Sequence, residues 1–326
     1  MTFQSDQKSK QISYLERSEF LGKIDLPNKP YQFTKSYKKY NLAPNIRDQA
    51  LAYFDHSDPT QKIAWHRHSG HACSSQACCV NFLFPLMRDE KRLTRWVEHL
   101  TGDIGLKMKV IESRHDRDEL IAFEWFPETD YLNESVGGMR SRGANATSVD
   151  AALIYSYQDQ VKLLLIEWKY IESYSHQRPL RTLSGDPTRL KRYHNLWKRP
   201  HGPLKQDLRF TLHDFFLEPW YQLLRQQMLA YHVETDPLSG IDKASVIHIS
   251  PSSNKTLRKV QGKKFEDYAF TLVPAVSKDR FKVFQSMLAT QWSDRFKSLS
   301  TRKAFACFTD HEGNFPWLRD RYPDLF

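Results

Sequence analysis

The sequence predicts an α/β fold with a mixed central sheet, whose core follows the order helix, strand, strand, strand, helix, strand. Two apolar runs, at 148–155 and 161–168, are separated by a short polar turn and predict an antiparallel hairpin. An apolar stripe at helical spacing predicts a helix over 218–232, and 243–250 predicts a strand that ends before Pro251. Further helices are expected to lie around this core.

Two helices are expected before the first strand. Ser74 is a candidate N-cap for a helix that we expect to stop at Pro85. A second apolar stripe spans 89–100 and is followed by a glycine, a residue typical of helix ends. Strand-like stretches follow at 106–111 and 120–126. These segments supply the opening helix and the first strand of the predicted core.

The second strand of the hairpin ends in charged residues. Glu167 and Lys169 are two positions apart, so they share one face of the strand. With a turn at Gln158 and Asp159, Asp150 lies directly opposite Glu167, with Cβ atoms about 5 Å apart. Two carboxylates placed in this way repel each other, and a divalent cation between them would remove the repulsion. Two alternatives remain: an ion-pair cluster in which Lys169 neutralises one acid, or a register slip that separates the carboxylates onto different faces.

The composition indicates a folded, basic protein. Its 326 residues include 48 Lys and Arg against 38 Asp and Glu, which gives a formal net charge of +10 and a pI of about 9.3. This balance favours an anionic partner such as nucleic acid. No stretch approaches the roughly 20 apolar residues of a membrane span, and the N-terminus has no apolar signal region, so we expect a cytoplasmic protein without membrane contact. Three of the four cysteines lie within 73–79, which favours reduced thiols over disulfides.

Basic residues are concentrated in two stretches. A glycine-rich loop at 136–143 precedes the hairpin, and 176–209 is strongly basic with interleaved aromatic residues and prolines. Such a surface suits sequence-independent contacts with a phosphate backbone, and a solvated surface loop is the alternative. The candidate contact residues are Arg140, Arg142, Arg178, Arg181, Arg189, Lys191, Arg192, Lys198 and Arg199.

The placement of Asp150, Glu167 and Lys169 on paired strands, within this order of elements, resembles the PD-(D/E)xK nuclease superfamily. That superfamily has a restriction-endonuclease-like fold with an αβββαβ core, an Asp on the second strand and Glu-x-Lys on the third. The stretch 74–85 is also similar to the first helix of a restriction-endonuclease branch of the superfamily. The resemblance covers about residues 65–250, and it departs from the motif because valine precedes the Asp in place of proline.

The resemblance implies a metal-dependent nuclease that hydrolyses phosphodiester bonds of DNA, as restriction and defence endonucleases do. It assigns Asp150 and Glu167 to Mg²⁺, for which Mn²⁺ can substitute, and Lys169 to the attacking water and the charge of the transition state. Gln226 is expected to face the site from the following helix, with Gln222 as a second candidate, although both fit an ordinary helix surface. Many relatives of the fold act as dimers, so a homodimer or a partner subunit is compatible with the resemblance.

On this interpretation, residues 1–64 form a basic N-terminal arm with a short helix at about 46–54. Residues 65–326 form the nuclease-like domain. We expect that domain to contain a basic insertion at about 172–215 and a C-terminal helical extension, in which 279–298 is predicted to be a helix.

Two other functions are left open by the sequence. A nuclease fold that binds DNA without cutting it would share the basic surface, although the intact Asp, Glu and Lys favour catalysis. A zinc site is the second alternative, because potential ligands cluster in one stretch, although their spacing matches no common pattern. These potential ligands are His66, His68, His71, Cys73, Cys78 and Cys79. Ser75 and Gln76 are expected mainly at a helix start, and Glu124 is a further acid that fits either a core or a surface position.

Overall fold

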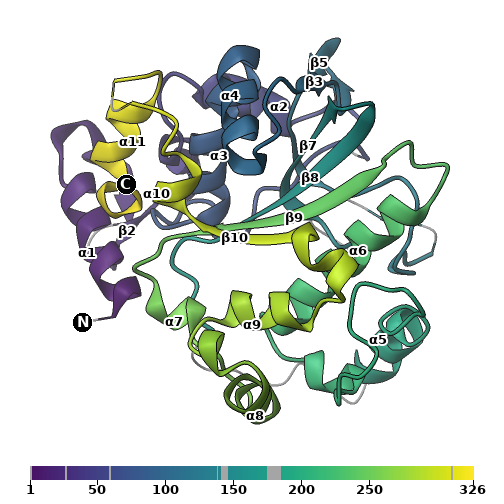
Figure 1. The fold of residues 1–326 in the computed structure, drawn as a ribbon. Helices are drawn as coiled ribbons and strands as arrows, with labels where there is room; N and C mark the ends of the chain where they lie inside the picture. The colour runs from purple at the N-terminus through teal and green to yellow at the C-terminus, as the bar shows by residue number, and fades with distance from the viewer. Residues whose placement is uncertain are drawn as a thin grey trace.

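The computed structural model describes residues 2–25, 28–58, 60–137, 139–140, 146–174, 185–309 and 311–326. Its centre is a six-stranded mixed sheet in the order β10-β9-β8-β7-β3, with β6 also paired to β7 (Figure 1). Strands β8, β9 and β10 are parallel, whereas β7 is antiparallel to β3, β6 and β8. The strands are β3 Lys107–Lys109, β6 Ala122–Trp125, β7 Val149–Tyr157, β8 Gln160–Trp168, β9 Lys243–Ser250 and β10 Phe296–Ser300. The predicted α/β class with a mixed sheet is confirmed.

Helices cover both faces of this sheet (Figure 1). Helices α3, Ser75–Met87, and α4, Glu90–Thr101, lie on one side, whereas α6, Trp220–Thr235, and α9, Arg280–Met287, lie on the other. Alternate residues of β8 enter two separate apolar cores, because successive side chains of a strand point to opposite faces. Leu164 belongs to the core under α3 and α4, and the next residue of the strand belongs to the core under α6.

Helix α3 continues through Pro85 and ends at Met87, so the predicted stop at the proline is wrong. A proline lacks a backbone N–H and therefore removes one hydrogen bond of the helix, but only the last turn depends on that bond. Leu86 and Met87 are buried in the core under α3 and α4. Burial of these two side chains offsets the missing hydrogen bond and keeps the last turn helical.

The helix predicted over 279–298 begins where expected, with Asp279 as its N-cap, but its predicted end is wrong. Helix α9 ends at Met287, a 3-10 turn follows at Thr290–Arg295, and the chain then enters β10. Phe296 pairs with Val246 of β9 in parallel register. The edge of β9 offers unpaired backbone groups, and pairing with them outweighs local helical preference.

The N-terminal segment folds against the C-terminal end of the chain. Helix α1, Phe3–Leu15, lies beside α11, Phe315–Arg321, in Figure 1. The buried amide of Gln11 donates from Nε2 to the Arg321 carbonyl at 2.7 Å, and the Tyr170 hydroxyl donates to Gln7 Oε1 at 2.9 Å. These contacts connect the first helix to the residue that follows Lys169.

Shorter elements complete the described chain. A short helix over Arg47–Phe54, α2, agrees with the predicted one. The described ranges contain no helix that is both long and apolar enough to cross a bilayer. The other elements are β1 Ile24–Asp25, β2 Lys29–Phe33, β4 Glu112–Arg114, β5 Arg117–Glu119, α5 Gly185–Tyr193, α7 Lys255–Arg258, α8 Lys263–Leu272, α10 Thr301–Ala304, and 3-10 turns at Ser18–Phe20, Lys35–Asn41, Leu212–Phe215, Pro274–Val276 and Pro323–Leu325.

Candidate active site

The hairpin of β7 and β8 has the predicted register. Its pairs run from Tyr157 opposite Gln160 to Ala151 opposite Ile166, so the next pair along this register is Asp150 and Glu167. The two turn residues both have positive φ, at 49° and 60°, which matches the right-handed twist of the strands. The two carboxylates therefore lie on neighbouring strands at the same level of the sheet.

Glu167 lies almost fully buried, with 2% of its surface exposed, and three side chains hold its carboxylate. Lys169 Nζ donates to Oε1, as expected for residues that share one face of a strand. Gln222 Nε2 donates to the same oxygen at 2.7 Å, and Gln226 Nε2 donates to Oε2. Both glutamines that were candidates for the site therefore contact Glu167 from α6.

Helix α6 can present both glutamines because they are four residues apart. Residues at this spacing lie one above the other on the same helix face. Gln226 is 1% exposed, so the alternative of an ordinary surface position is wrong for this residue. Its Oε1 is buried and has no hydrogen-bond partner within the described part of the chain. This orphaned acceptor lies beside the Glu167 carboxylate.

Asp150 is partly exposed at the start of β7, where the strand pairing ends. Its Oδ2 accepts the backbone N–H of Trp168 at 2.7 Å. Burial, and then the neighbouring charge of Glu167, raise the pKa of Asp150 well above its ordinary value, although Lys169 acts in the opposite direction. The folded chain thus disfavours the ionised form of this carboxyl in the absence of a cation.

Lys169 is 9% exposed, and its positive charge interacts with the carboxylates of both Glu167 and Asp150. Burial acts to lower the pKa of Lys169, but the Glu167 carboxylate, together with Asp150 and other acids, raises it well above the ordinary value. The ammonium is therefore charged at neutral pH. A charged lysine stabilises negative charge but cannot accept a proton.

A third carboxylate, Glu124 of β6, joins this edge of the sheet. Phe123 pairs with Ala151 and Trp125 with Val149, which places Glu124 at the level of Asp150. Its charge is among the causes that raise the pKa of Asp150. The sequence left open whether Glu124 lies in the core or on the surface, and the structure shows it 4% exposed.

Glu124 is held by Gln76 at the start of α3 and by His66 in the segment before that helix. Gln76 Nε2 donates to Glu124 Oε1 at 2.8 Å, and His66 Nε2 lies 3.3 Å from the same oxygen. The hydrogen bond to Glu124 raises the pKa of His66 above its ordinary value, although burial opposes it. Glu124 also has a φ of 51°, a left-handed conformation that is uncommon outside glycine and often found at functional sites. An acid inside an otherwise apolar strand was the sequence signal for this group.

The neighbouring β9 contributes a neutral side chain. His248 pairs with Glu167 in the parallel register and contacts the ring of Phe281 at 4.0 Å. Burial, with a further contribution from Lys169, lowers the pKa of His248 well below its ordinary value. This imidazole forms an uncharged wall beside the carboxylate pair.

The histidines and cysteines near α3 are not gathered into one cluster in the described part of the chain. Burial raises the pKa of Cys73 to about 12, because the thiolate is disfavoured inside the core. His71 Nδ1 accepts the Cys73 backbone N–H at 2.9 Å, while His66 contacts Glu124. Across the described ranges, no group of three or more His, Cys, Asp and Glu side chains is arranged to hold a metal ion. These observations give no support to the zinc alternative.

A comparison with protein families identifies the chain. The model of the family described as "restriction endonuclease associating with ARP" matches residues 6–323, which is nearly the entire sequence. The chain belongs to this family. No curated protein and no solved structure matches it. Membership supports the restriction-endonuclease part of the resemblance.

In this restriction-endonuclease family member, the predicted DNA-contact residues occupy varied positions. Arg142, Arg178 and Arg181 lie outside the described residues. The Arg140 guanidinium lies over the Phe126 ring at 4.9 Å. The remaining candidates lie on α5 or just after it, and they are Arg189, Lys191, Arg192, Lys198 and Arg199.

Several of these side chains are already engaged. Arg192 Nη2 donates to the Glu134 carbonyl at 3.2 Å, and Lys198 Nζ donates to the Leu208 carbonyl at 2.7 Å. Arg199 donates to the Asn195 carbonyl at 3.2 Å but is itself exposed. Lys191 is exposed on α5. The available basic surface is therefore smaller than the sequence list suggests.

A buried polar cluster connects this basic segment to α6. Arg225 Nη1 lies 3.3 Å from Glu134 Oε1 and donates to Thr147 Oγ1 at 3.1 Å. The Tyr193 hydroxyl, at the end of α5, donates to the same Glu134 oxygen at 2.6 Å. Since α6 also carries Gln222 and Gln226, the cluster fixes α5 on the side of the sheet that holds Glu167.

Proposed function

We propose that the chain is a metal-dependent DNA endonuclease of the PD-(D/E)xK type, with a restriction or defence role. The observation that carries the proposal is the position of Asp150 opposite Glu167, with Lys169 donating to the Glu167 carboxylate. Family membership supports a restriction endonuclease, and DNA is the substrate that such an enzyme implies.

The donor set suits a magnesium ion. Asp150 and Glu167 offer hard carboxylate oxygens, and Mg²⁺ usually takes one or two carboxylates together with waters and substrate phosphate. Burial and then the charge of Glu167 raise the pKa of Asp150, and a divalent cation would favour the ionised form of this carboxyl. When bound, Mg²⁺ or Mn²⁺ supplies polarisation of a phosphate oxygen and a more acidic bound water.

The other side chains then have distinct roles. Lys169, held in its charged form, offsets the negative charge that develops on the phosphate in the transition state. Gln226 and Gln222 fix the orientation of Glu167 from α6. Glu124, with Gln76 and His66, contributes a further negative charge beside Asp150. Exposed cations such as Lys191 and Arg199 would contact the phosphate backbone without reading sequence.

The proposal is tested by incubating plasmid and linear DNA, methylated and unmethylated, with Mg²⁺, Mn²⁺ or chelator. The wild type is expected to cut with metal only, and Lys169→Ala is expected to lose at least about a hundredfold in rate, because a preorganised charge near the phosphate is removed. Asp159→Asn, at the exposed far end of the same hairpin, is the matched control and should cut normally.

A binding module would give a different result. Salt-sensitive DNA binding without cutting of any substrate would indicate that alternative, or an enzyme that needs a partner subunit. Equal cutting by wild type and Lys169→Ala would mean that the nuclease activity lies elsewhere.

A further inference from the structure

A pocket beside the proposed catalytic site is lined by aromatic, apolar and basic side chains. It has a volume of about 250 Å³ and lies between the 3-10 turn at Lys35–Asn41 and the segment that leads into α3. The apolar side chains that line it are Leu42, Leu51, Trp65 and Ala77. This hollow, called the Trp65 pocket below, is large enough for a single nucleobase.

Trp65 presents a fixed aromatic ring to this pocket. Its indole stacks on the Phe54 ring, with centroids 4.0 Å apart and an angle of 17° between the planes. Phe54 is 1% exposed and belongs to the core under α3 and α4, so it holds the indole from the core side. Trp65 itself is partly exposed. An aromatic ring held in this way is a platform on which a nucleobase can stack.

The charged side chains of the Trp65 pocket are all basic. Lys38, Lys39 and Arg67 line it, and no carboxylate does so in the described part of the chain. None of these three cations has a carboxylate partner within the described ranges. Cations that are left without an internal counter-charge attract the phosphates of a nucleic acid.

The two segments that carry these cations are held together. The buried Asn41 side chain donates from Nδ2 to the Ser69 carbonyl at 2.9 Å. The stem of Lys38 packs on Gly70, where a Cβ atom would lie only 2.9 Å from Lys38 Cγ. The turn that follows Arg67 therefore lies against the 3-10 turn, and cations of both segments line one pocket.

His66 connects the Trp65 pocket to the proposed catalytic site. It lines the pocket, and its Nε2 lies 3.3 Å from Glu124 Oε1. Its backbone N–H donates to Gln76 Oε1 at 2.8 Å, and Gln76 donates in turn to the same Glu124 oxygen. A nucleotide in the pocket would therefore lie next to the acids around Asp150.

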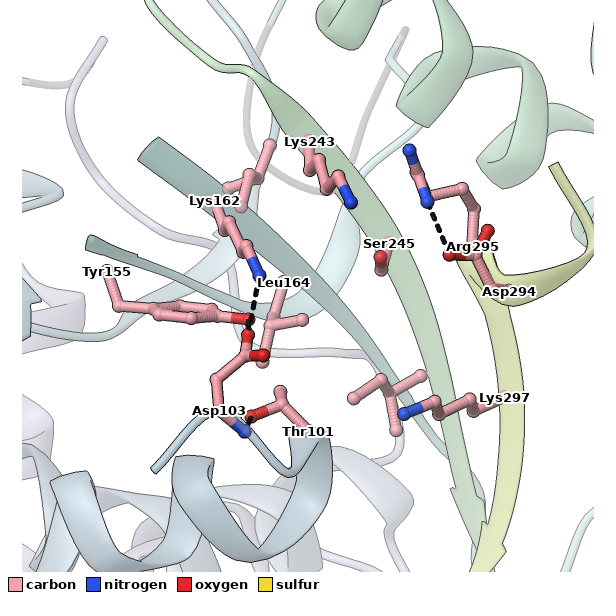
Figure 2. Close-up of a pocket in the computed structure, with 12 residues that line it drawn as sticks. Thr101, Asp103, Tyr155, Lys162, Leu164, Lys243, Ser245, Asp294, Arg295 and Lys297 are labelled. Atoms are coloured by element: carbon pink, nitrogen blue, oxygen red, sulfur yellow. Dashed lines mark hydrogen bonds and ion pairs between the residues drawn. The ribbon is translucent and has the colours of Figure 1, made fainter. Parts of the chain in front are cut away.

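A cavity at the other end of β8 provides a contrast within the same molecule (Figure 2). Its cations stand beside carboxylates, because Lys162 Nζ donates to Asp103 Oδ2 at 2.8 Å and Arg295 Nη1 to Asp294 Oδ2 at 2.6 Å. Such pairs neutralise each other in large part. That cavity therefore offers an incoming anion less attraction than the Trp65 pocket does.

We propose that the Trp65 pocket binds one unpaired nucleotide of the DNA strand, with its base against Trp65 and the adjacent phosphates at Lys38, Lys39 and Arg67. Inside a duplex, neighbouring bases cover both faces of a base. A base must therefore leave the stack, or lie in a single-stranded segment, to reach the indole. The identity of the strand as DNA rests on the proposed nuclease function, whereas binding in the pocket requires no cleavage.

The test compares a short oligodeoxythymidylate with its abasic counterpart of equal length and charge, by fluorescence anisotropy of the full chain in chelator. We expect the wild type to bind the thymidylate at least about fivefold more tightly than the abasic strand, because only the thymidylate can stack on Trp65. Trp65→Leu should bind both strands alike. Equal wild-type affinities for the two strands would overturn the proposal.

Arg67→Met and Lys39→Met test the phosphate contacts. Both side chains are exposed, so their replacement should leave Tm unchanged. Each variant should weaken the binding of both strands by at least about threefold, because a charge contact that the two strands share is lost. Lys282→Met, an exposed lysine on α9, is the matched control and should bind as the wild type does. Wild-type affinity in Arg67→Met and Lys39→Met would overturn the assignment of the phosphates.

A duplex with one mispaired aminopurine, a fluorescent base analogue, tests the requirement for an unpaired base without any substitution of Trp65. The wild type should bind it at least about threefold more tightly than the perfectly paired duplex, and the aminopurine fluorescence should change as the base stacks on the indole. Equal affinity for the two duplexes, with no change in fluorescence, would overturn the assignment to an unpaired nucleotide.

Failure of the pocket and failure of the nuclease proposal give different results. All binding measurements are made in chelator, so a chain that cuts no DNA would still show the base preference if the pocket binds a nucleotide. DNA cleavage by a wild type that shows no base preference would overturn the pocket and leave the nuclease proposal standing.

Discussion

Asp150 lies next to a buried carboxylate of the same charge, with one lysine to balance both. Its Oδ2 accepts the Trp168 N–H, yet its pKa is raised because burial and Glu167 outweigh that hydrogen bond and Lys169. An ordinary structural aspartate would be placed where its ionised form is favoured. Because burial and Glu167 disfavour the ionised form of Asp150, we expect a cation to bind at this position.

This environment predicts how stability depends on pH. A carboxyl whose folded pKa is raised binds more protons in the folded state, so the free energy of unfolding falls as pH rises from the ordinary value of 3.8 towards the raised value. In chelator, the Asp150→Asn variant should lack this contribution, and its stability relative to wild type should grow with pH. Chemical denaturation at a series of pH values measures the difference. A constant difference across the series would contradict the raised pKa.

Residue positions on regular strands could be predicted from the sequence. The register of β7 and β8 followed from two apolar runs and a two-residue turn, and one further step along that register puts Asp150 opposite Glu167. Glu124 was harder, because its positive φ interrupts the alternation on which such predictions depend. Its contact with Gln76 also joins residues far apart in the chain, which no local pattern reveals.

At the scale of elements, α6 is the support of the site. It buries one face against β9 and presents Gln222 and Gln226 to Glu167. The same helix carries Gln227, which is fully buried and whose amide has no hydrogen-bond partner within the described ranges. Two adjacent buried glutamines thus differ in whether they touch the site.

This difference allows a matched pair of variants. Gln226→Met removes a hydrogen bond to Glu167 and should lower kcat roughly tenfold with little change in KM, because it loosens a carboxylate that acts in the transition state. Gln227→Met should leave kcat unchanged and be neutral or stabilising, since an unsatisfied buried amide is removed. Steady-state kinetics and thermal unfolding of both variants test the prediction. An equal loss of kcat in the two would show only a packing effect.

The two incorrect predictions concern where helices end. Local pattern favoured a helix over 279–298, but the edge of β9 recruits 296–300 as a strand. Similarly, α3 passes Pro85 because the residues after it are buried in the core. In both places tertiary contacts decided the conformation, and a single sequence does not display such contacts.

At the scale of the whole molecule, the two ends of the chain are fixed beside the strand that carries Glu167. The core under α3 and α4 includes both Trp168 and the C-terminal residues Phe315 and Tyr322. Helix α1 completes this side through the hydrogen bonds of Gln7 and Gln11. The position of Lys169 therefore depends on segments near both termini.

Gln11→Ala tests this long-range connection. Gln11 is fully buried, and its loss leaves the Arg321 carbonyl without this donor, so the free energy of unfolding should fall by about 1–3 kcal/mol. Gln4→Ala, an exposed glutamine on the same helix, should change it by less than about 0.5 kcal/mol. Urea denaturation measures both values. No loss for Gln11→Ala would mean that α1 does not support the core.

The central claim is that Asp150 and Glu167 act together as the metal-binding pair of a nuclease. The most direct measurement is the single-turnover rate of DNA cleavage in Mg²⁺ for Asp150→Asn, Glu167→Gln and the double variant, with Asp159→Asn as control. We predict a loss of at least about a thousandfold in each single variant and no further loss in the double variant, because groups that act as a unit are not additive. Wild-type rates in either single variant, or losses that multiply in the double variant, would contradict the claim.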